Sequence, residues 1–222
     1  VFSRHAHTDC VLFDVVQWVD DHHQQRIPLP QFEVMSGYEA FSECLSWAIH
    51  GVYMARRALY ERYPYDDSCR AYSDDNTTRL HYYISREVRP CGGLYYYRQH
   101  EASVTHKADL CHFDYLRANE SMRRQLIDLA VGDDVLRRYE NQRWLVLVDC
   151  WRFYFIHRQR MTPHDRRVAR AEMKRVWKTI DTTALEPCNK WKLGYMPLRP
   201  SWRLFCLQEK LYFMLKRWLR RL

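Results

Sequence analysis

The first hundred residues alternate between strand-like and helix-like hydrophobic patterns. Residues 9–19, DCVLFDVVQWV, place apolar side chains at alternating positions, which predicts a strand entering a sheet. A polar loop bounded by proline is predicted over residues 20–30. Ser36 and Glu39 have the spacing of a capping box ahead of apolar positions, which predicts the start of a helix. The further elements predicted in this part are a strand at 51–55, a helix at 56–63, a helix from 73 to about 86 capped by Ser73, and two short strands at 88–91 and 94–98 around a Gly92-Gly93 turn.

From about residue 108 onward the apolar positions recur with helical spacing. Helices are predicted near 108–130, 133–158, 163–180 and 200–221, and prolines mark the breaks between several of them. The sequence therefore predicts an α/β (α+β) protein with a mixed sheet and helices in residues 1–107. A largely helical, basic extension is predicted for residues 108–222.

Charge divides unevenly along the chain. The net charge of the 222 residues is +8. Residues 151–222 hold 18 Lys and Arg against 5 Asp and Glu, a net of +13, so the first 150 residues carry −5. A basic third on an acidic body indicates an anionic partner at one end, either a membrane surface, a phosphate-bearing acceptor or a nucleic acid.

The cysteines and the apolar runs indicate a cellular compartment. The eight cysteines are scattered and form no Cys-x-x-Cys pair or zinc-spaced cluster, which is typical of buried thiols in a reducing compartment. The longest apolar stretch, residues 144–156, contains two charges and is too short to span a bilayer. We therefore expect a cytoplasmic protein. The acidic and histidine run at residues 20–23 is interpreted as a solvated loop in preference to a metal site.

The most specific stretch is Tyr72 to Lys107, YSDDNTTRLHYYISREVRPCGGLYYYRQHEASVTHK. It contains an acidic pair that opens a helix with an Arg about one turn later, then a Leu-Tyr-x-Tyr-Arg strand and a Ser-Val-Thr turn. Upstream, Met35-Ser36-Gly37 and the segment 47–57, WAIHGVYMARR, precede it in the matching order. This ordered set, over roughly residues 30–107, resembles the second half of the catalytic domain of bacterial family 2 glycosyltransferases of the GT-A type.

The resemblance implies an acceptor-side part of an inverting glycosyltransferase of bacterial surface polysaccharide synthesis. Such an enzyme transfers a sugar from a nucleotide-sugar donor to a saccharide or a lipid-linked saccharide acceptor. The resemblance does not cover the donor-nucleotide half, where a divalent metal, Mg²⁺ or Mn²⁺, would bind, so we expect no metal site in this chain and no activity from the chain alone. A sheet edge left exposed where the donor half pairs would favour a dimer.

Asp74 and Asp75 are the candidate catalytic residues. An acceptor hydroxyl that attacks an anomeric carbon must lose its proton to a carboxylate that is ionised at neutral pH. The first turn of a helix favours an ionised carboxylate. The family's motif is usually Glu-Asp, and alignment on Arg79 places its Asp at Asp74 with Ser73 where Glu is common, so the choice between the two aspartates stays open. The alternative interpretation is that Ser-Asp-Asp is only a helix cap.

Six further residues are candidates for substrate binding. The resemblance places Trp47 and His50 near the transferred sugar, and Arg98, Gln99 and His106 near the donor diphosphate and the acceptor. Arg79, one turn after the aspartates, can orient a carboxylate. For Trp47 the alternative is a core side chain, for Arg79 it is a surface ion pair, and for Arg98 it is a structural salt bridge.

The C-terminal segment predicts an amphipathic helix. Basic residues recur at positions 203, 210, 217 and 221, and beside them runs an apolar stripe that comprises Leu204, Leu207, Leu211, Leu215, Trp218 and Leu222, widened by Phe205, Tyr212 and Phe213. This pattern is typical of a helix in a membrane interface, which here would be the inner face of the plasma membrane, but a helix packed on its own domain has it too.

Two rival functions stay open, a nucleic-acid-binding module and a non-catalytic helical scaffold at a membrane. No nucleic-acid-binding motif supports the first, so we expect no nucleic-acid partner.

Overall fold

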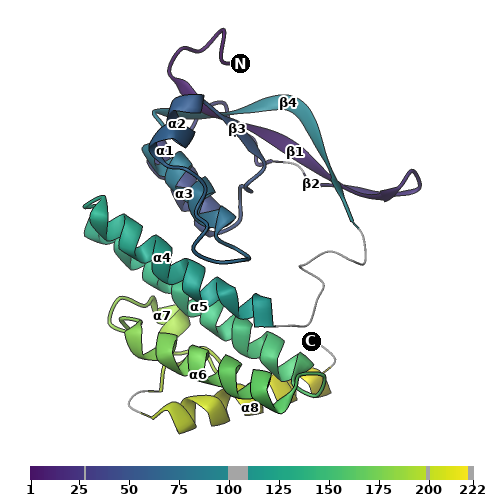
Figure 1. The fold of residues 1–222 in the computed structure, drawn as a ribbon, viewed down its shortest axis with the longest axis vertical. Coiled ribbons are helices and arrows are strands. Elements are labelled where there is room, and N and C mark those ends of the chain that lie inside the picture. The colour runs from purple at the N-terminus through teal and green to yellow at the C-terminus, as the bar shows by residue number, and fades with distance from the viewer. Residues whose placement is uncertain (28, 100–109, 199–200, 220–222) are drawn as a thin grey trace. The chain divides into compact units, whose positions relative to one another are not determined.

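The computed structural model describes residues 1–27, 29–99, 110–198 and 201–219 (Figure 1). They divide into two compact units, which are treated separately below. Unit one comprises residues 1–67 and 72–107, and unit two comprises residues 68–71 and 108–222. Unit one contains strands and helices, and unit two is helical. The predicted fold class, a mixed α/β part followed by helices, is therefore confirmed.

The sheet of unit one is built around β1 (Thr8–Asp20). β4 (Glu87–Arg98) runs parallel to β1 along one edge. On the other edge β3 (Tyr53–Ala55) pairs antiparallel with the start of β1, and β2 (His23–Ile27) pairs antiparallel with its end. The sheet is therefore mixed, and its central strand is the one that the alternating pattern predicts.

Two details of the sheet differ from the sequence prediction. β2 lies within the predicted loop, because the Asp20 carboxylate accepts hydrogen bonds from the backbone of His22 and His23 and closes a hairpin. The predicted turn at Gly92-Gly93 is instead an irregularity inside one continuous strand, since the register passes from Leu12↔Pro90 to Asp14↔Leu94. A Cβ on Gly93 would lie 3.0 Å from the Phe13 ring, so a larger residue at this bulge would require the ring to shift.

The outer edge of β4 is partly covered. Met35 exchanges two backbone hydrogen bonds of 2.9 Å with Val88. Beyond Met35, the described residues provide no strand on the outer side of the second half of β4, the side away from β1. The alternation of Tyr95, Tyr96 and Tyr97 predicts that at least one of them faces the core, but all three are exposed, since no described helix or strand of unit one covers their side chains.

The helices of unit one are α1 (Gly37–Leu45), α2 (Arg57–Arg62) and α3 (Asp74–Ile84). The capping box at the start of α1 is present, since the Ser36 side chain accepts from Glu39 and the Glu39 side chain accepts from Ser36. α3 begins where the sequence predicts it, but the Ser73 side chain makes no capping hydrogen bond, and its carbonyl accepts from Asn76 instead. Both larger helices bury apolar side chains, among them Phe41 on α1 and Tyr82 on α3.

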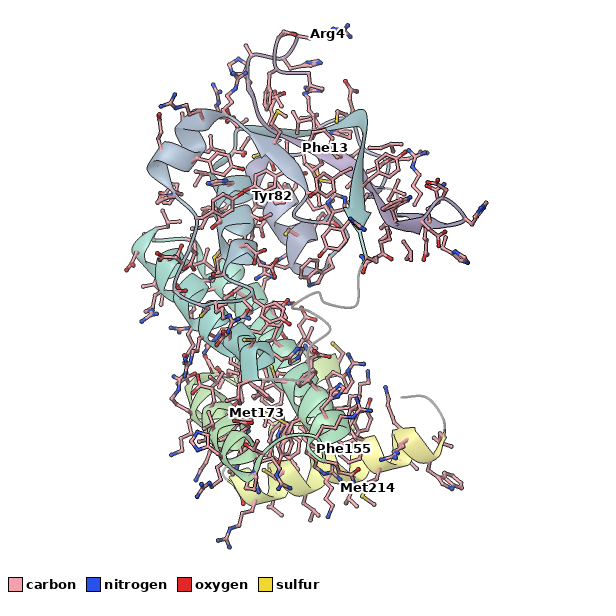
Figure 2. All side chains as sticks on the ribbon, turned by 45° about the vertical axis from the view of Figure 1, so that its right-hand side comes forward. Arg4, Phe13, Tyr82, Phe155, Met173 and Met214 are labelled. Carbon is pink, nitrogen blue, oxygen red and sulfur yellow. The ribbon has the colours of Figure 1, made fainter. Side chains whose placement is uncertain are left out.

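Unit two is a helical bundle (Figure 1). Its core is rich in aromatic side chains. Its elements are η2 (Leu110–Phe113), α4 (Asp114–Asp128), α5 (Asp133–His157), α6 (Pro163–Thr179), α7 (Pro187–Lys190) and α8 (Trp202–Trp218). Figure 2 shows Phe155 of α5 and Met173 of α6 inside the bundle, and both are buried. Trp144 is fully buried and its indole N–H donates to the Tyr195 carbonyl at 2.8 Å, so the core also fixes the loop after α7. None of the helices in the described ranges combines the length and apolar character needed to cross a bilayer.

Candidate functional site

The acidic pair lies on the first turn of α3. Asp74 is exposed and Asp75 is half-buried. The preceding loop fixes this turn, because the Asn76 amide donates to the Asp66 carboxylate at 2.7 Å and the Asp66 N–H donates to the Thr77 hydroxyl at 2.8 Å. The positive end of the helix stabilises ionised carboxylates at this position. An exposed carboxylate in this place is able to accept a proton from a bound hydroxyl group.

Arg79 lies beneath Trp47. The Arg79 side chain is only 1% exposed, and its guanidinium carbon lies 6.0 Å from the centroid of the Trp47 ring. Burial raises the pKa of the Cys44 thiol to about 11, and Arg79 opposes that shift while Asp75 adds to it. Arg79 and Asp75 therefore both lie near the same buried thiol. The buried Arg79 thus places a positive charge close to the first turn of α3.

Trp47 has an unusual backbone for a large side chain. Its φ is 60°, and its side chain is 51% exposed. A bulky residue in the left-handed region costs about 1 kcal/mol or more relative to glycine. A core tryptophan would be buried, whereas a tryptophan that stacks on a sugar must have an exposed ring face. The half-exposed Trp47 is compatible with stacking.

His50 is fixed against the middle of α3. Its carbonyl accepts from the Tyr82 hydroxyl at 2.7 Å, and its Nδ1 accepts from the Val52 N–H at 3.1 Å. Burial lowers the pKa of His50, so the imidazole is neutral at pH 7 and carries its hydrogen on Nε2. Gly51 follows it and packs on Thr78, whose hydroxyl would lie 3.2 Å from an added Cβ.

Five of the eight candidate residues lie on α3 or contact it. Asp74, Asp75 and Arg79 belong to the helix, the Trp47 ring lies over Arg79, and the His50 carbonyl is bound by Tyr82 nearer the other end of the helix. Arg98 and Gln99 lie elsewhere, at the end of β4. The Arg98 guanidinium carbon is 5.8 Å from the Trp18 ring centroid, and the Gln99 N–H donates to the Trp18 carbonyl at 2.8 Å. His106 lies outside the described residues.

Metal binding was considered for the run at residues 20–23. The Asp20 carboxylate is used within the β1–β2 turn, where the His22 N–H, the His23 ring and the His23 N–H bind it and lower its pKa. Across the described ranges, no three His, Cys, Asp or Glu side chains are placed to hold a metal ion. The Mg²⁺ or Mn²⁺ that the resemblance implies would therefore need ligands from outside the described residues.

Grooves of about 700 Å³ in each unit lie away from the candidate residues. The groove of unit one is lined by Asp14, Leu29, Arg89 and their neighbours, and none of the eight candidates lines it. The groove of unit two lies between α6 and the start of α8, and its lining includes five cations and two tryptophans. The α6 cations were not predicted as a site, although Arg167, Arg170, Lys174 and Lys178 recur at intervals of three or four residues. That spacing places them along one side of a helix.

Comparison with known proteins adds no relative. The chain matches no protein-family model, no curated protein and no solved structure. The features that bear on function are therefore the ordered motifs of the sequence and the residues on and against α3.

Proposed function

We propose that the chain is the acceptor-side part of an inverting, bacterial family 2 glycosyltransferase. The enzyme transfers a sugar from a nucleotide-sugar donor to a saccharide or lipid-linked saccharide in surface polysaccharide synthesis. The observation that supports this most is an exposed aromatic ring, that of Trp47, over a buried arginine of α3, the helix whose first turn carries the two carboxylates. These residue types suit stacking on a sugar, orienting a carboxylate and removing a hydroxyl proton.

In this proposal the carboxylate of Asp74, or else that of Asp75, is the general base. It takes the proton of the acceptor hydroxyl while that oxygen bonds to the anomeric carbon of the donor sugar. The bond between this carbon and the donor phosphate breaks, and its electron pair leaves with the nucleoside diphosphate. Asp74 is the more exposed of the two and so is better placed to meet an acceptor.

Arg79 and Trp47 have supporting roles. Arg79 is buried, so it acts through the acidic turn and through the Trp47 ring, not by direct contact with the sugar. Trp47 offers the sugar a face. The nucleotide and its divalent cation bind, in this proposal, to a donor half that the resemblance does not cover. The half of the β4 edge that the described residues leave without a partner strand suits such a partner half. Without the donor half, a dimer through this edge is expected, which sedimentation velocity over a range of concentrations would measure.

Saccharide binding can be measured on this chain directly. Saturation-transfer NMR with a panel of mono- and oligosaccharides should show binding that Trp47→Ala abolishes. Trp191→Ala is the matched control, since Trp191 is an exposed tryptophan of unit two, and it should leave binding unchanged. Equal binding by both variants, or no binding to any saccharide, would count against a sugar site at Trp47.

Turnover tests the base. In a protein that also contains the donor half, Asp74→Asn should lower the rate about 10²- to 10⁴-fold and leave donor binding nearly intact. Asp133→Asn is the control, because Asp133 is likewise an exposed aspartate in the first turn of a helix, α5. If Asp74→Asn and Asp75→Asn both keep full turnover, neither aspartate is the base.

A further inference from the structure

Helix α8 has two apolar faces, and only one of them is covered. Phe205, Tyr212 and Phe213 are buried in the core of unit two, so they do not widen the predicted stripe. The other face is exposed along the whole helix, with fractions from 46% to 78%. We call it the outer stripe, and it comprises Leu204, Leu207, Leu211, Met214, Leu215, Trp218 and Leu219. Figure 2 shows Met214 on the outer margin of α8, away from Phe155 and Met173.

The outer stripe is too continuous to be ordinary surface. Single exposed apolar side chains are common on proteins, but a contiguous apolar strip is a mark of an interaction site. Its members follow one another at three- and four-residue spacing over the length of a 17-residue helix. The last residue of α8 is Trp218, which is 78% exposed, and a tryptophan at the end of such a helix suits the headgroup level of a membrane.

Cations lie beside the outer stripe. Arg203, Lys210 and Arg217 are seven residues apart, which places them in one row along α8 next to the leucines. Arg203 also lines the groove between α6 and α8, and with it the groove holds Arg167, Arg170, Lys174 and Lys178. No carboxylate lines this groove, and none of its five cations forms an ion pair with another described residue. Arg175 on the same helix contrasts with them, since it pairs with Glu120 and Glu172.

We propose that unit two docks on an anionic membrane surface through α8. The outer stripe lies in the boundary between headgroups and acyl chains, and the groove cations bind lipid phosphates. This proposal does not rest on transferase activity, and either can fail without the other.

Charge and polarity together favour a membrane over other occupants. A nucleic acid would neutralise the cations but leave seven apolar side chains in water. A second copy of the chain would cover the apolar side chains, but a twofold contact through α8 would bring two rows of like charges together. An anionic leaflet would bury the outer stripe in its apolar region and pair the cations with its phosphates.

Co-sedimentation with vesicles tests the proposal on the whole chain. The protein should partition more strongly to phosphatidylcholine vesicles that contain phosphatidylglycerol than to pure phosphatidylcholine, and added salt should weaken the difference. Lys174→Ser should lower partitioning to the anionic vesicles about fivefold. Arg124→Ser, which removes an exposed cation of α4, is its matched control and should have little effect.

The apolar arm uses Leu211→Gln and Trp218→Ala, each of which should lower partitioning by about tenfold. Trp191→Ala is the control, because Trp191 and Trp218 are both 78% exposed but only Trp218 lies on the outer stripe. These side chains are outside the core, and unchanged thermal unfolding should confirm that the variants fold.

Three results would overturn the proposal. One is equal partitioning of wild type and the outer-stripe variants. Another is oligonucleotide binding that Lys174→Ser abolishes and Leu211→Gln does not, which would assign the groove to nucleic acid. The third is a dimer in sedimentation velocity that Leu211→Gln dissociates, which would assign the stripe to a second copy of the chain.

Discussion

A buried glutamate makes the stability of unit two depend on pH in an unusual direction. Glu209 of α8 is fully buried. Its Oε1 accepts from the Gln208 amide at 3.2 Å, and its Oε2 has no hydrogen-bond partner within the described part of the chain. Burial raises the pKa of Glu209 from 4.5 to about 8, with a smaller opposing effect from Gln208. The folded protein therefore holds a protonated Glu209 at neutral pH.

The size of the effect follows from proton linkage. Between pH 4.5 and about 8 the folded state keeps a proton that the unfolded state loses, so the free energy of unfolding falls as pH rises, by about 1.4 kcal/mol per pH unit. At pH 7 the cost amounts to about 3 kcal/mol. Glu209→Gln has the same shape as the protonated acid and does not titrate. The variant should therefore be about 3 kcal/mol more stable than wild type at pH 7 and equally stable near pH 4.5.

Urea unfolding followed by tryptophan fluorescence at half-unit pH steps measures this difference. The gap between wild type and Glu209→Gln should open above pH 4.5 and stop growing above about pH 8. Glu186→Gln, at an exposed glutamate of the same unit, should track wild type at every pH. A gap that does not change with pH would refute the reasoning, because it requires the same Glu209 pKa in the folded and unfolded states. A Glu209→Gln protein that is less stable than wild type at pH 7 would refute it too, because that requires an ionised and stabilised Glu209.

Three further predictions concern unit one, each checked by urea unfolding. Gly37→Ala should lower the free energy of unfolding by about 2–4 kcal/mol, because its new Cβ would lie 2.3 Å from the Ser85 carbonyl oxygen. Gly92→Ala is the control and should lower it by less than about 0.5 kcal/mol, because its new Cβ would meet no atom within 4 Å beyond the neighbouring residues. Asp9→Asn should destabilise the protein by about 1–3 kcal/mol at pH 7. Burial alone would raise the pKa of Asp9, but the hydrogen bonds and the charge of Arg86 outweigh burial and lower that pKa. The ionised Asp9 therefore stabilises the folded protein above pH 3.8, and the cost of Asp9→Asn should shrink as pH falls below 3.8. Trp47→Gly should change the free energy of unfolding by less than about 1 kcal/mol, because glycine adopts the φ of 60° without strain and this offsets the lost contacts. Loss of a core tryptophan would instead lower the free energy of unfolding by about 3–5 kcal/mol, and a loss of that size would make Trp47 a structural residue.

Local signals in the sequence determined most of the secondary structure. The alternation in residues 9–19 predicts β1, and the Ser36 and Glu39 spacing predicts the start of α1, because both signals depend only on neighbouring residues. The four long helical segments after residue 108 appear as α4, α5, α6 and α8 for the same reason. The prediction of two short strands around Gly92-Gly93 was wrong, because neighbouring residues alone do not determine whether a strand continues there. The strand at Glu87–Arg98 continues through two glycines because β1 pairs with it on both sides of the bulge.

The candidate site was only partly available from the sequence. The motif order points to Asp74, Asp75 and Arg79, and helical spacing places the arginine one turn after the acids. That Arg79 is buried, and that Trp47 stays half-exposed above it, depends on how α1 packs against α3, which no local pattern specifies.

Only the tertiary structure decided which face of α8 is covered. Periodicity shows that the helix has apolar residues around much of its circumference, and it cannot tell an inner from an outer face. Packing against α5 buries Phe205 and Phe213 and leaves Leu211 and Trp218 in solvent. The sequence by itself therefore determined that α8 is amphipathic and basic. The arrangement of the bundle decided that an apolar face is left over for a partner, because burial depends on neighbours that are distant in the chain.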